Sequence, residues 1–180
     1  MGLLSHTELV GLVANGVITK VSPEMINGSS IDITLGSTIM YENDSLSWSP
    51  INIAERQALN MNRMSIKESS YVLDPDEFIL GHSEQEFHLP SDISADYHLK
   101  SSLGRVGLEH VKAGWCDPWW KGSVLTLELK NLTRYHKLLL TPGMRIGQMT
   151  FHRHTPVPEE HGYGVRGRYN NDKSVSGVKI

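Results

Sequence analysis

The sequence predicts a mainly-β single domain with one short helix at its start. Sixteen glycines and eight prolines separate many short apolar runs, which favours turns and strands over long helices. Residues 31–36 alternate apolar and polar side chains, the pattern of a strand with two different faces. At 180 residues the chain can form a substantial core, so we expect residues 1–180 to make one domain.

The composition limits the possible partners. Hydrophobic residues make up 39% of the chain, charged residues 21%, and the formal net charge is -3, so no basic field would draw it to nucleic acid or an anionic membrane. No run of about 18 apolar residues is present to span a membrane. Cys116 is the single cysteine, so no intramolecular disulfide can form, and a reducing, cytoplasmic location is predicted.

The helix is predicted over residues 6–15. Residues 5–8, Ser-His-Thr-Glu, have the form of a capping box, apolar residues follow at helical spacing, and Gly16 is a natural stop. Strands are predicted at residues 31–36, 71–73, 78–82, 124–129, 137–140 and 146–151, and the last two flank a turn at 141–144. Residues 42–70 are polar and carry at most a strand or two. From about Glu159 the chain is predicted to be a flexible tail that becomes ordered on binding.

Glu128 is the first candidate functional residue. It lies within the strand-like run 124–129, among apolar and β-branched neighbours. A carboxylate buried there must be paired, neutralised or used, because burying it bare costs too much free energy. The alternative is that Glu128 lies on the solvent face of an edge strand, which is common for charged residues.

Other patterns suggest chemistry that the chain cannot complete. His82-Ser83-Glu84 has the His-x-Glu pattern of zinc deaminases, but one cysteine cannot supply their Cys-x-x-Cys, so this zinc chemistry is excluded. His152 and His154 have no nearby carboxylate, which favours exposed side chains over a metal pair. Cys116 is interpreted as a packed thiol because the sequence shows no basic partner for it. P-loop and GxGxxG motifs are absent.

A polar cluster at residues 100–105 could hold phosphate. Two cations and two hydroxyls lie within six residues, next to Gly104, where the backbone could approach a ligand closely. The tail adds Arg166, Arg168 and Lys173. From the residues alone, a solvated surface is the alternative for both groups.

Five ordered blocks cover nearly the whole chain: INGSSIDITLG, KSSLGRVGLEH, AGWCDPWWKGSVLTLELKN, TPGMRIGQMTF and HGYGVRGRY. Their order resembles the dCTP deaminases, the metal-free deaminase branch of the trimeric dUTPase superfamily, which includes bifunctional dCTP deaminase-dUTPases. The resemblance implies a distorted β-barrel of jelly-roll, dUTPase-like type. It also implies a homotrimer in which each active site is assembled from more than one chain.

The resemblance assigns roles residue by residue. It implies that Glu128 is the general base for a water, that Ser101 orients this water, and that Arg105 tunes the charge around the glutamate. The remaining residues that match substrate-binding positions are Lys100, Ser102, Leu103, Gly104, Ala113, Asp117, Thr126, Leu127, Gln148, Tyr163 and Arg168. Mg²⁺ would be bound through the triphosphate, with no side-chain ligand, and zinc would not be needed.

The chain departs from the family pattern at two places. Asp172 stands where a tail glutamine is expected, which leaves the end of the triphosphate site open. The loop has one residue fewer than the pattern between Arg105 and Asp117 and one more between Asp117 and Glu128, so the separation of Arg105 from Glu128 is kept. Residues 113–115, Ala-Gly-Trp, are closer to the bifunctional members than to the monofunctional ones.

Three functions follow from the resemblance. The first is deamination of dCTP to dUTP and ammonia in pyrimidine deoxynucleotide metabolism, with dTTP as a candidate inhibitor. The second is a bifunctional enzyme that also cleaves dUTP to dUMP and pyrophosphate, with Asp117 positioning the attacking water. The third is a catalytically silent trimer that binds a nucleotide. Retention of Ser101, Arg105 and Glu128 together favours an enzyme over the third.

Overall fold

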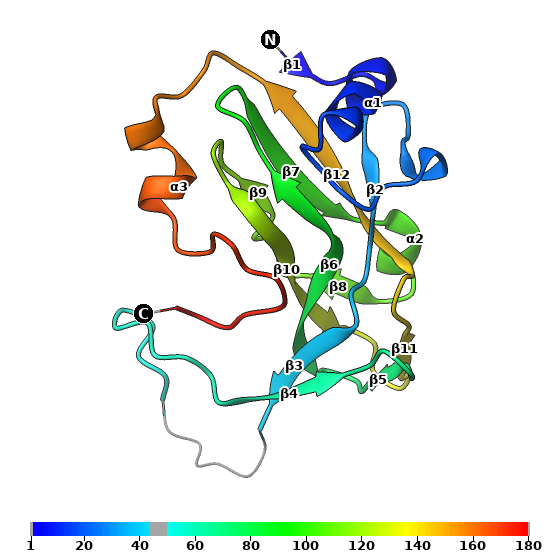
Figure 1. Cartoon of the computed structure of the whole chain (residues 1–180). Coiled ribbons are helices and arrows are strands. Elements are labelled where there is room, and N and C mark those ends of the chain that lie inside the picture. Colours follow the sequence, from blue (N-terminus) through cyan, green and yellow to red (C-terminus); the bar gives the residue numbers. More distant parts are fainter. Residues whose placement is uncertain (1, 44–49, 180) are drawn as a thin grey trace.

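Two antiparallel five-stranded sheets form the molecule, as the mainly-β prediction requires (Figure 1). The computed structural model describes residues 2–43 and 50–179. The first sheet consists of β1 (Gly2–Leu3), β12 (Arg145–Arg153), β7 (Ile93–Leu99) and β9 (Trp115–Cys116) in that order, with β2 (Ile31–Thr34) also paired to β12. The second has the order β4 (Met61–Ser65), β3 (Thr38–Glu42), β6 (Phe78–His88), β10 (Lys121–Asn131) and β8 (Leu108–His110). β5 (Tyr71–Leu73) and β11 (Leu138–Leu140) form a separate pair.

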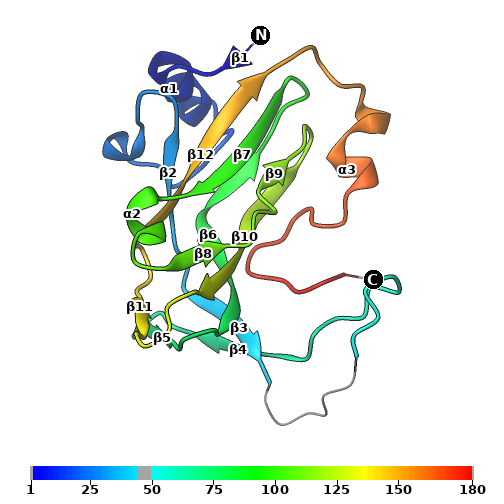
Figure 2. The same cartoon turned by 180° about the vertical axis from the view of Figure 1, so that it is seen from behind.

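The helices are short. α1 (His6–Ala14) agrees with the predicted N-terminal helix, and the Glu8 carboxylate accepts hydrogen bonds from the backbone N–H and the hydroxyl of Ser5, at 3.0 and 2.9 Å. α2 (Ser101–Gly104), α3 (Tyr163–Arg166) and the 3₁₀ turns η1 (Pro23–Met25) and η2 (Glu159–His161) complete the set in the described part of the chain. α2 and α3 lie on opposite sides of the molecule in both side views (Figures 1 and 2).

The core lies between the sheets and takes alternate residues from each strand. Ile31, Ile33 and Leu35 are fully buried, as the alternation predicts, and so are Leu127 and Leu129 of β10. The polar residues between the first three are also buried, because β2 is covered on both faces. The predicted strands are all present, although β6 extends to residue 88, well beyond the expected end at 82.

Strand β7 is the longest of the described elements that were not predicted, a group that also includes β3, β8 and β9. It pairs with β12 over seven residues, from Gly147 opposite Leu99 to Arg153 opposite Ile93. Its apolar residues alternate cleanly, at positions 93, 95, 97 and 99, so the pattern of a half-buried strand was available in the sequence. Gly147 has a packing role here, because a Cβ at this position would come within 2.2 Å of the Tyr97 ring.

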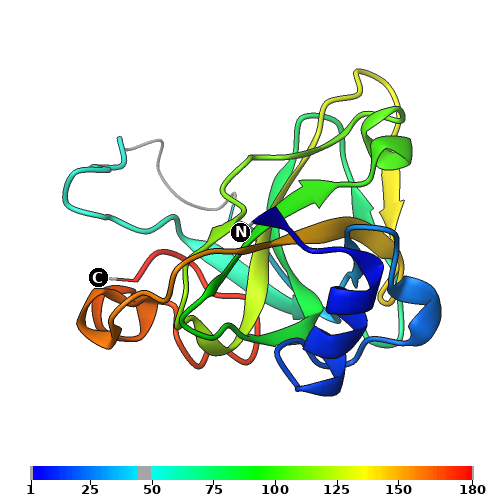
Figure 3. The ribbon, with the colours of Figure 1, turned by 90° about the horizontal axis from the view of Figure 1, so that it is seen from above.

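The tail folds back over the molecule. From above, the segment from α3 to the C-terminus runs along the side opposite α1 (Figure 3). It is anchored to β10, where the backbone N–H of Val124 donates to the Asp172 carbonyl at 2.8 Å, and Val175 is buried. The tail is therefore placed against strand β10 in this structure, and its predicted mobility before binding stays a prediction.

Candidate active site

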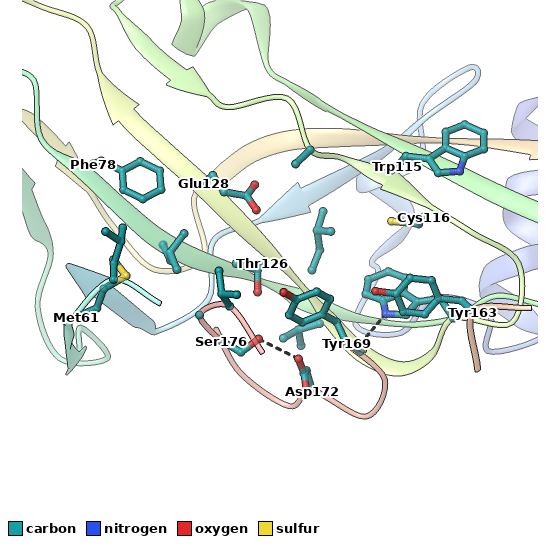
Figure 4. Close-up of a pocket in the computed structure, with 18 residues that line it drawn as sticks. Met61, Phe78, Trp115, Cys116, Thr126, Glu128, Tyr163, Tyr169, Asp172 and Ser176 are labelled. Atoms are coloured by element: carbon teal, nitrogen blue, oxygen red, sulfur yellow. Dashed lines mark hydrogen bonds between the residues drawn. The ribbon is translucent and has the colours of Figure 1, made fainter. Parts of the chain in front are cut away.

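A cavity of about 500 Å³ opens between β10, β6 and the tail. Glu128 and Thr126 line it from β10, Phe78 and Leu80 from β6, and Tyr163 and Tyr169 from the tail. Figure 4 shows the Glu128 carboxylate directed into the space that these side chains surround. The cavity thus has mainly apolar walls and few polar groups, among them the Glu128 carboxylate, which is the usual character of a small-molecule site.

The alternation of β10 sets which side chains reach this cavity. Thr126 and Glu128 face the cavity, whereas Leu127 and Leu129 face the core and are fully buried. An irregularity in the pairing with β6 between Val124 and Thr126 lets Leu125 line the cavity as well. Leu127, expected to contact substrate, could do so only through its backbone because its side chain lies in the core.

Glu128 does not lie on an exposed edge. β10 is an inner strand between β6 and β8, and Glu128 is opposite Leu80 in the ladder. Its side chain is 25% exposed, and its Oε2 lies 3.2 Å from Nε2 of His110, whose side chain is 3% exposed. The interpretation of a solvent-facing edge residue is therefore excluded for this chain, and Glu128 is a half-buried acid at the wall of a cavity.

The polar cluster at residues 100–105 lies elsewhere. Ser101 and Ser102 are in α2, which is exposed, and Arg105 directly follows it. None of residues 100–105 lines the cavity that holds Glu128. Within one chain, the structure thus separates the three proposed catalytic residues into two groups, Glu128 on one side and Ser101 with Arg105 on the other.

Lys100 is bound to an acid that the sequence analysis did not select. Asp32, 1% exposed, accepts hydrogen bonds from Lys100 Nζ at 2.7 Å and from the Asn27 side-chain amide at 2.9 Å. Arg145 places a second cation 3.1 Å from the other carboxylate oxygen. The buried carboxylate is thereby fully paired, and it fixes Lys100 at the start of α2.

We expect Asp32→Asn to weaken both the fold and the polar cluster. The substitution leaves two cations without their acid; since both are partly exposed, the expected loss is about 1–3 kcal/mol in the free energy of unfolding. The resemblance places Lys100 among the substrate-binding residues, and without Asp32 its ammonium loses its fixed position, so nucleotide affinity should fall several-fold. Chemical denaturation and nucleotide titration measure the two effects.

Asp76→Asn is the matched control for that substitution. Asp76 pairs with Lys130 at 2.7 Å, but its side chain is 87% exposed, so its removal should change stability very little. Equal effects of the two substitutions would contradict a special role for Asp32.

Only some of the other expected substrate contacts lie at the cavity. Ala113 and Tyr163 line it. Asp117 is exposed beside the cavity residue Cys116, and its carboxylate accepts the indole N–H of Trp115 at 2.9 Å. Gln148 lies on β12 in the first sheet, opposite His98, away from this cavity, and Arg168 is exposed on the tail without lining it.

Two neighbouring tryptophans in the shifted loop hold the tail in place. The indole of Trp119 donates to the Val157 carbonyl and that of Trp120 to the Tyr169 carbonyl, each at 2.8 Å. The ring of Trp119 fits against Gly162, where a Cβ would come within 2.2 Å of it. The loop that departs from the family pattern is thus the surface on which the tail docks.

Asp172 lines the cavity at the end of the tail. One carboxylate oxygen accepts the Ser176 hydroxyl at 2.9 Å, and the other binds the ammonium of Lys179. Lys179 also lies over the ring of Tyr169, at 5.4 Å. The acid that replaces the expected glutamine is therefore neutralised within the tail itself.

Cys116 and His82, which the sequence analysis did not assign to chemistry, have structural roles. Cys116 is buried, and burial raises the pKa of its thiol, so it is a protonated packing residue. His82 is packed against Gly36, and burial lowers the pKa of its imidazole. Across residues 2–43 and 50–179, no three His, Cys, Asp or Glu side chains come together in a metal-binding arrangement.

Sequence reasoning missed two residues near the functional groups, Asp32 and His110. Asp32 is an acid inside an apolar alternation, which is the same pattern that selected Glu128. His110 ends the short strand β8, and β8 pairs with β10 so that His110 opposes Leu129, next to Glu128. No sequence pattern reports that pairing, because the two strands are joined by a long irregular loop.

The fold and the cavity define a mainly-β protein with the Glu128 carboxylate inside a mostly apolar site and an exposed polar cluster, residues 100–105, that lies outside it. The family model for dCTP deaminase-like proteins matches residues 3–154. The chain belongs to the dCTP deaminase-like family.

Two relatives agree with this assignment, and a solved structure shares the fold. A protein named "dCTP deaminase, dUMP-forming" from Acidothermus cellulolyticus is 38% identical over 168 residues, covering 90% of this chain and 85% of that protein. One of the same name from Bifidobacterium adolescentis is 36% identical over 166 residues, covering 90% and 84%. The crystal structure of 2'-deoxycytidine 5'-triphosphate deaminase from Agrobacterium tumefaciens shares the fold with a TM-score of 0.67 at 20% identity, over 84% of this chain and about half (49%) of that one.

Proposed function

We propose that this protein is a hydrolytic dCTP deaminase that releases dUMP. The single observation that carries the proposal is the Glu128 carboxylate, 25% exposed, in a cavity of about 500 Å³ in a chain of this family. The names of the relatives at 36–38% identity favour dUMP over dUTP as the final product. The overall reaction is dCTP + 2 H₂O → dUMP + NH₃ + pyrophosphate.

The deamination step uses Glu128 as the general base. Its carboxylate takes a proton from a water that adds to C4 of cytosine, and the same proton then goes to the ring nitrogen. Collapse of the tetrahedral intermediate expels the amino group, which leaves as ammonia after gaining the second proton of the water. Ser101 orients the water, Arg105 stabilises the charge that develops, and the backbone near Ala113 reads the base edge.

The rest of the nucleotide is held by polar groups around the base pocket. We assign Tyr163 and Gln148 to the sugar and its phosphate, and Lys100, Ser102 and Arg168 to the triphosphate. Mg²⁺ enters as part of the substrate, where it neutralises phosphate oxygens. We assign it no side chain, since both oxygens of the nearby acid Asp172 are already bonded within the tail.

Two copies of the chain are needed for this reaction. Glu128 lies in the cavity while Ser101 and Arg105 lie in and beside the exposed helix α2, so the polar loop of one subunit must complete the cavity of another. We therefore propose a homotrimer with shared active sites, acting on dCTP and then dUTP. None of the helices in the described part of the chain has the length and hydrophobicity to span a bilayer; a cytoplasmic location remains a prediction from the single cysteine.

Product analysis tests the proposal. Purified protein incubated with dCTP and Mg²⁺ should release ammonia, dUMP and pyrophosphate in equal amounts, with dUTP as a transient at most. Ammonia with stable dUTP would show deamination alone and overturn the dUMP-forming part. Nucleotide binding without any turnover would overturn the enzyme in favour of a nucleotide-binding trimer.

Asp117 carries the second half of the reaction in this proposal. Its carboxylate would position the water that attacks the triphosphate of dUTP. Trp115 holds one oxygen of this carboxylate, which leaves the other for the water. The cleavage of dUTP to dUMP needs such a positioned carboxylate. Asp117 lies beside the Glu128 cavity rather than inside it.

A further inference from the structure

His110 occupies a special position behind Glu128. Its Nε2 lies 3.2 Å from Glu128 Oε2, within ion-pair range. The contact depends on the sheet, because β8 pairs with β10 at this point and the Val111 N–H donates to the Glu128 carbonyl at 3.0 Å. The ring of Tyr97 packs on the imidazole with centroids 4.6 Å apart, which holds it in place.

The polar atoms of this group are unpartnered. Among the described residues, four buried side-chain atoms lack a hydrogen bond, and three of them belong here: Tyr97 Oη, His110 Nε2 and Glu128 Oε2. The last two are close but not aligned for a hydrogen bond as they stand. Buried polar atoms are normally bonded, so an orphaned pair at a cavity wall indicates a contact that forms when the site is occupied.

His110 also lines a second, smaller cavity. It has a volume of about 220 Å³ and is lined by Tyr97, His98, Leu99, Glu109, His110 and Lys112. His110 therefore lines this cavity and lies 3.2 Å from the acid that lines the larger one. Neither Ser101 nor Arg105 lines the smaller cavity.

We propose that His110 is a positioning residue for Glu128 in the proposed deamination. Its Nε2–H donates to Oε2 of Glu128 when substrate is bound, which fixes the carboxylate and directs Oε1 to the attacking water. Tyr97 acts only as the packing surface that sets the imidazole plane. The inference rests on the proposed function, since a positioned base matters only if the base acts on water.

His110→Asn and His110→Gln both replace the imidazole by an amide, and together they distinguish the loss of a hydrogen-bond donor at the place of Nε2 from a change in side-chain volume. The amide nitrogen of glutamine can reach the place of Nε2, whereas that of asparagine corresponds to Nδ1 and falls short of Glu128. We expect His110→Asn to lower kcat for ammonia release by about 10- to 100-fold with KM little changed, the effect of losing a hydrogen bond to a charged group. His110→Gln should keep most of kcat. Glu109→Gln, an exposed neighbour on the same strand, is the control and should behave as wild type.

Other outcomes would overturn the inference. Near-normal kcat in His110→Asn, equal losses in both amide variants, or a rise in KM without a fall in kcat each contradicts a donor to Glu128. If His110→Asn does not fold, ¹⁵N-histidine spectra of the wild type decide. The signal that is absent from His110→Gln must show the proton on Nε2, and a proton on Nδ1 alone excludes the proposal. A wild type that releases no ammonia from dCTP refutes the proposed function itself, whereas an active wild type with unaffected His110 variants refutes this inference alone.

Discussion

Glu128→Gln is expected to reduce ammonia release from dCTP by at least about a hundredfold, the scale of a lost general base. Glutamine has nearly the same shape and stays polar, so the cavity between β6, β10 and the tail should keep its form. The amide cannot accept the proton of water, so the first chemical step is lost while recognition of base, sugar and phosphates remains. Single-turnover rates with dCTP and Mg²⁺, together with the Kd for dCTP, measure chemistry and binding separately.

The control for this prediction is again Glu109→Gln, an acid on β8 that lies outside the Glu128 cavity. It changes the net charge by the same amount as Glu128→Gln. A normal rate in Glu128→Gln would remove this residue from catalysis. A loss of dCTP binding as large as the loss of rate would make Glu128 a binding residue only.

Two inactive variants are expected to restore activity when they assemble together. Arg105→Ala should lose at least about a hundredfold in rate because it removes charge stabilisation, and Glu128→Gln loses the base. In a trimer of mixed subunits, some cavities join an intact Glu128 of one copy to an intact Arg105 of the next. Each trimer with both kinds of subunit has one complete site in three, so isolated mixed trimers should recover about a third of wild-type activity.

This recovery follows from where the structure places the two groups. Glu128 points into the cavity, whereas residues 100–105 do not line it and α2 is exposed (Figures 1 and 4). Co-expression with two different tags and purification through both tags isolates the mixed trimers. A mixture of Glu128→Gln and Glu128→Ala is the control and cannot recover. Mixed trimers without recovered activity would show that each chain supplies its own Arg105, which contradicts shared sites.

Most of the fold was predictable because the sequence patterns that specify its helix and strands involve residues close together in the chain. The capping box at Ser5 and Glu8, the alternation at residues 31–35 and the apolar strand around Glu128 each depend on neighbours in sequence. Strand β7 was missed although its alternation was present. The extension of β6 to His88 was missed because its buried residues Ser83 and Gln85 are themselves polar, so residues 83–86 show no apolar alternation.

The site was predictable only in part. The residues of the base pocket could be selected because they belong to recognisable blocks, and the structure brings Thr126, Glu128, Ala113 and Tyr163 to one cavity. The pairing of Asp32 with Lys100 could not be selected, because 68 residues separate the two partners. The contact of His110 with Glu128 depends in the same way on which strands are neighbours.

The sequence by itself determined the fold class and the family resemblance, and it selected Glu128 as the candidate acid for activating water. Those properties are set by residue type and by spacing of a few positions, which the chain carries without folding. Only the tertiary structure decided that Glu128 lies in an inner strand, that Asp32 binds Lys100 and His110 lies beside Glu128, and that residues 100–105 lie apart from the Glu128 cavity. These depend on long-range strand pairing, where contacts form between segments that no local pattern connects.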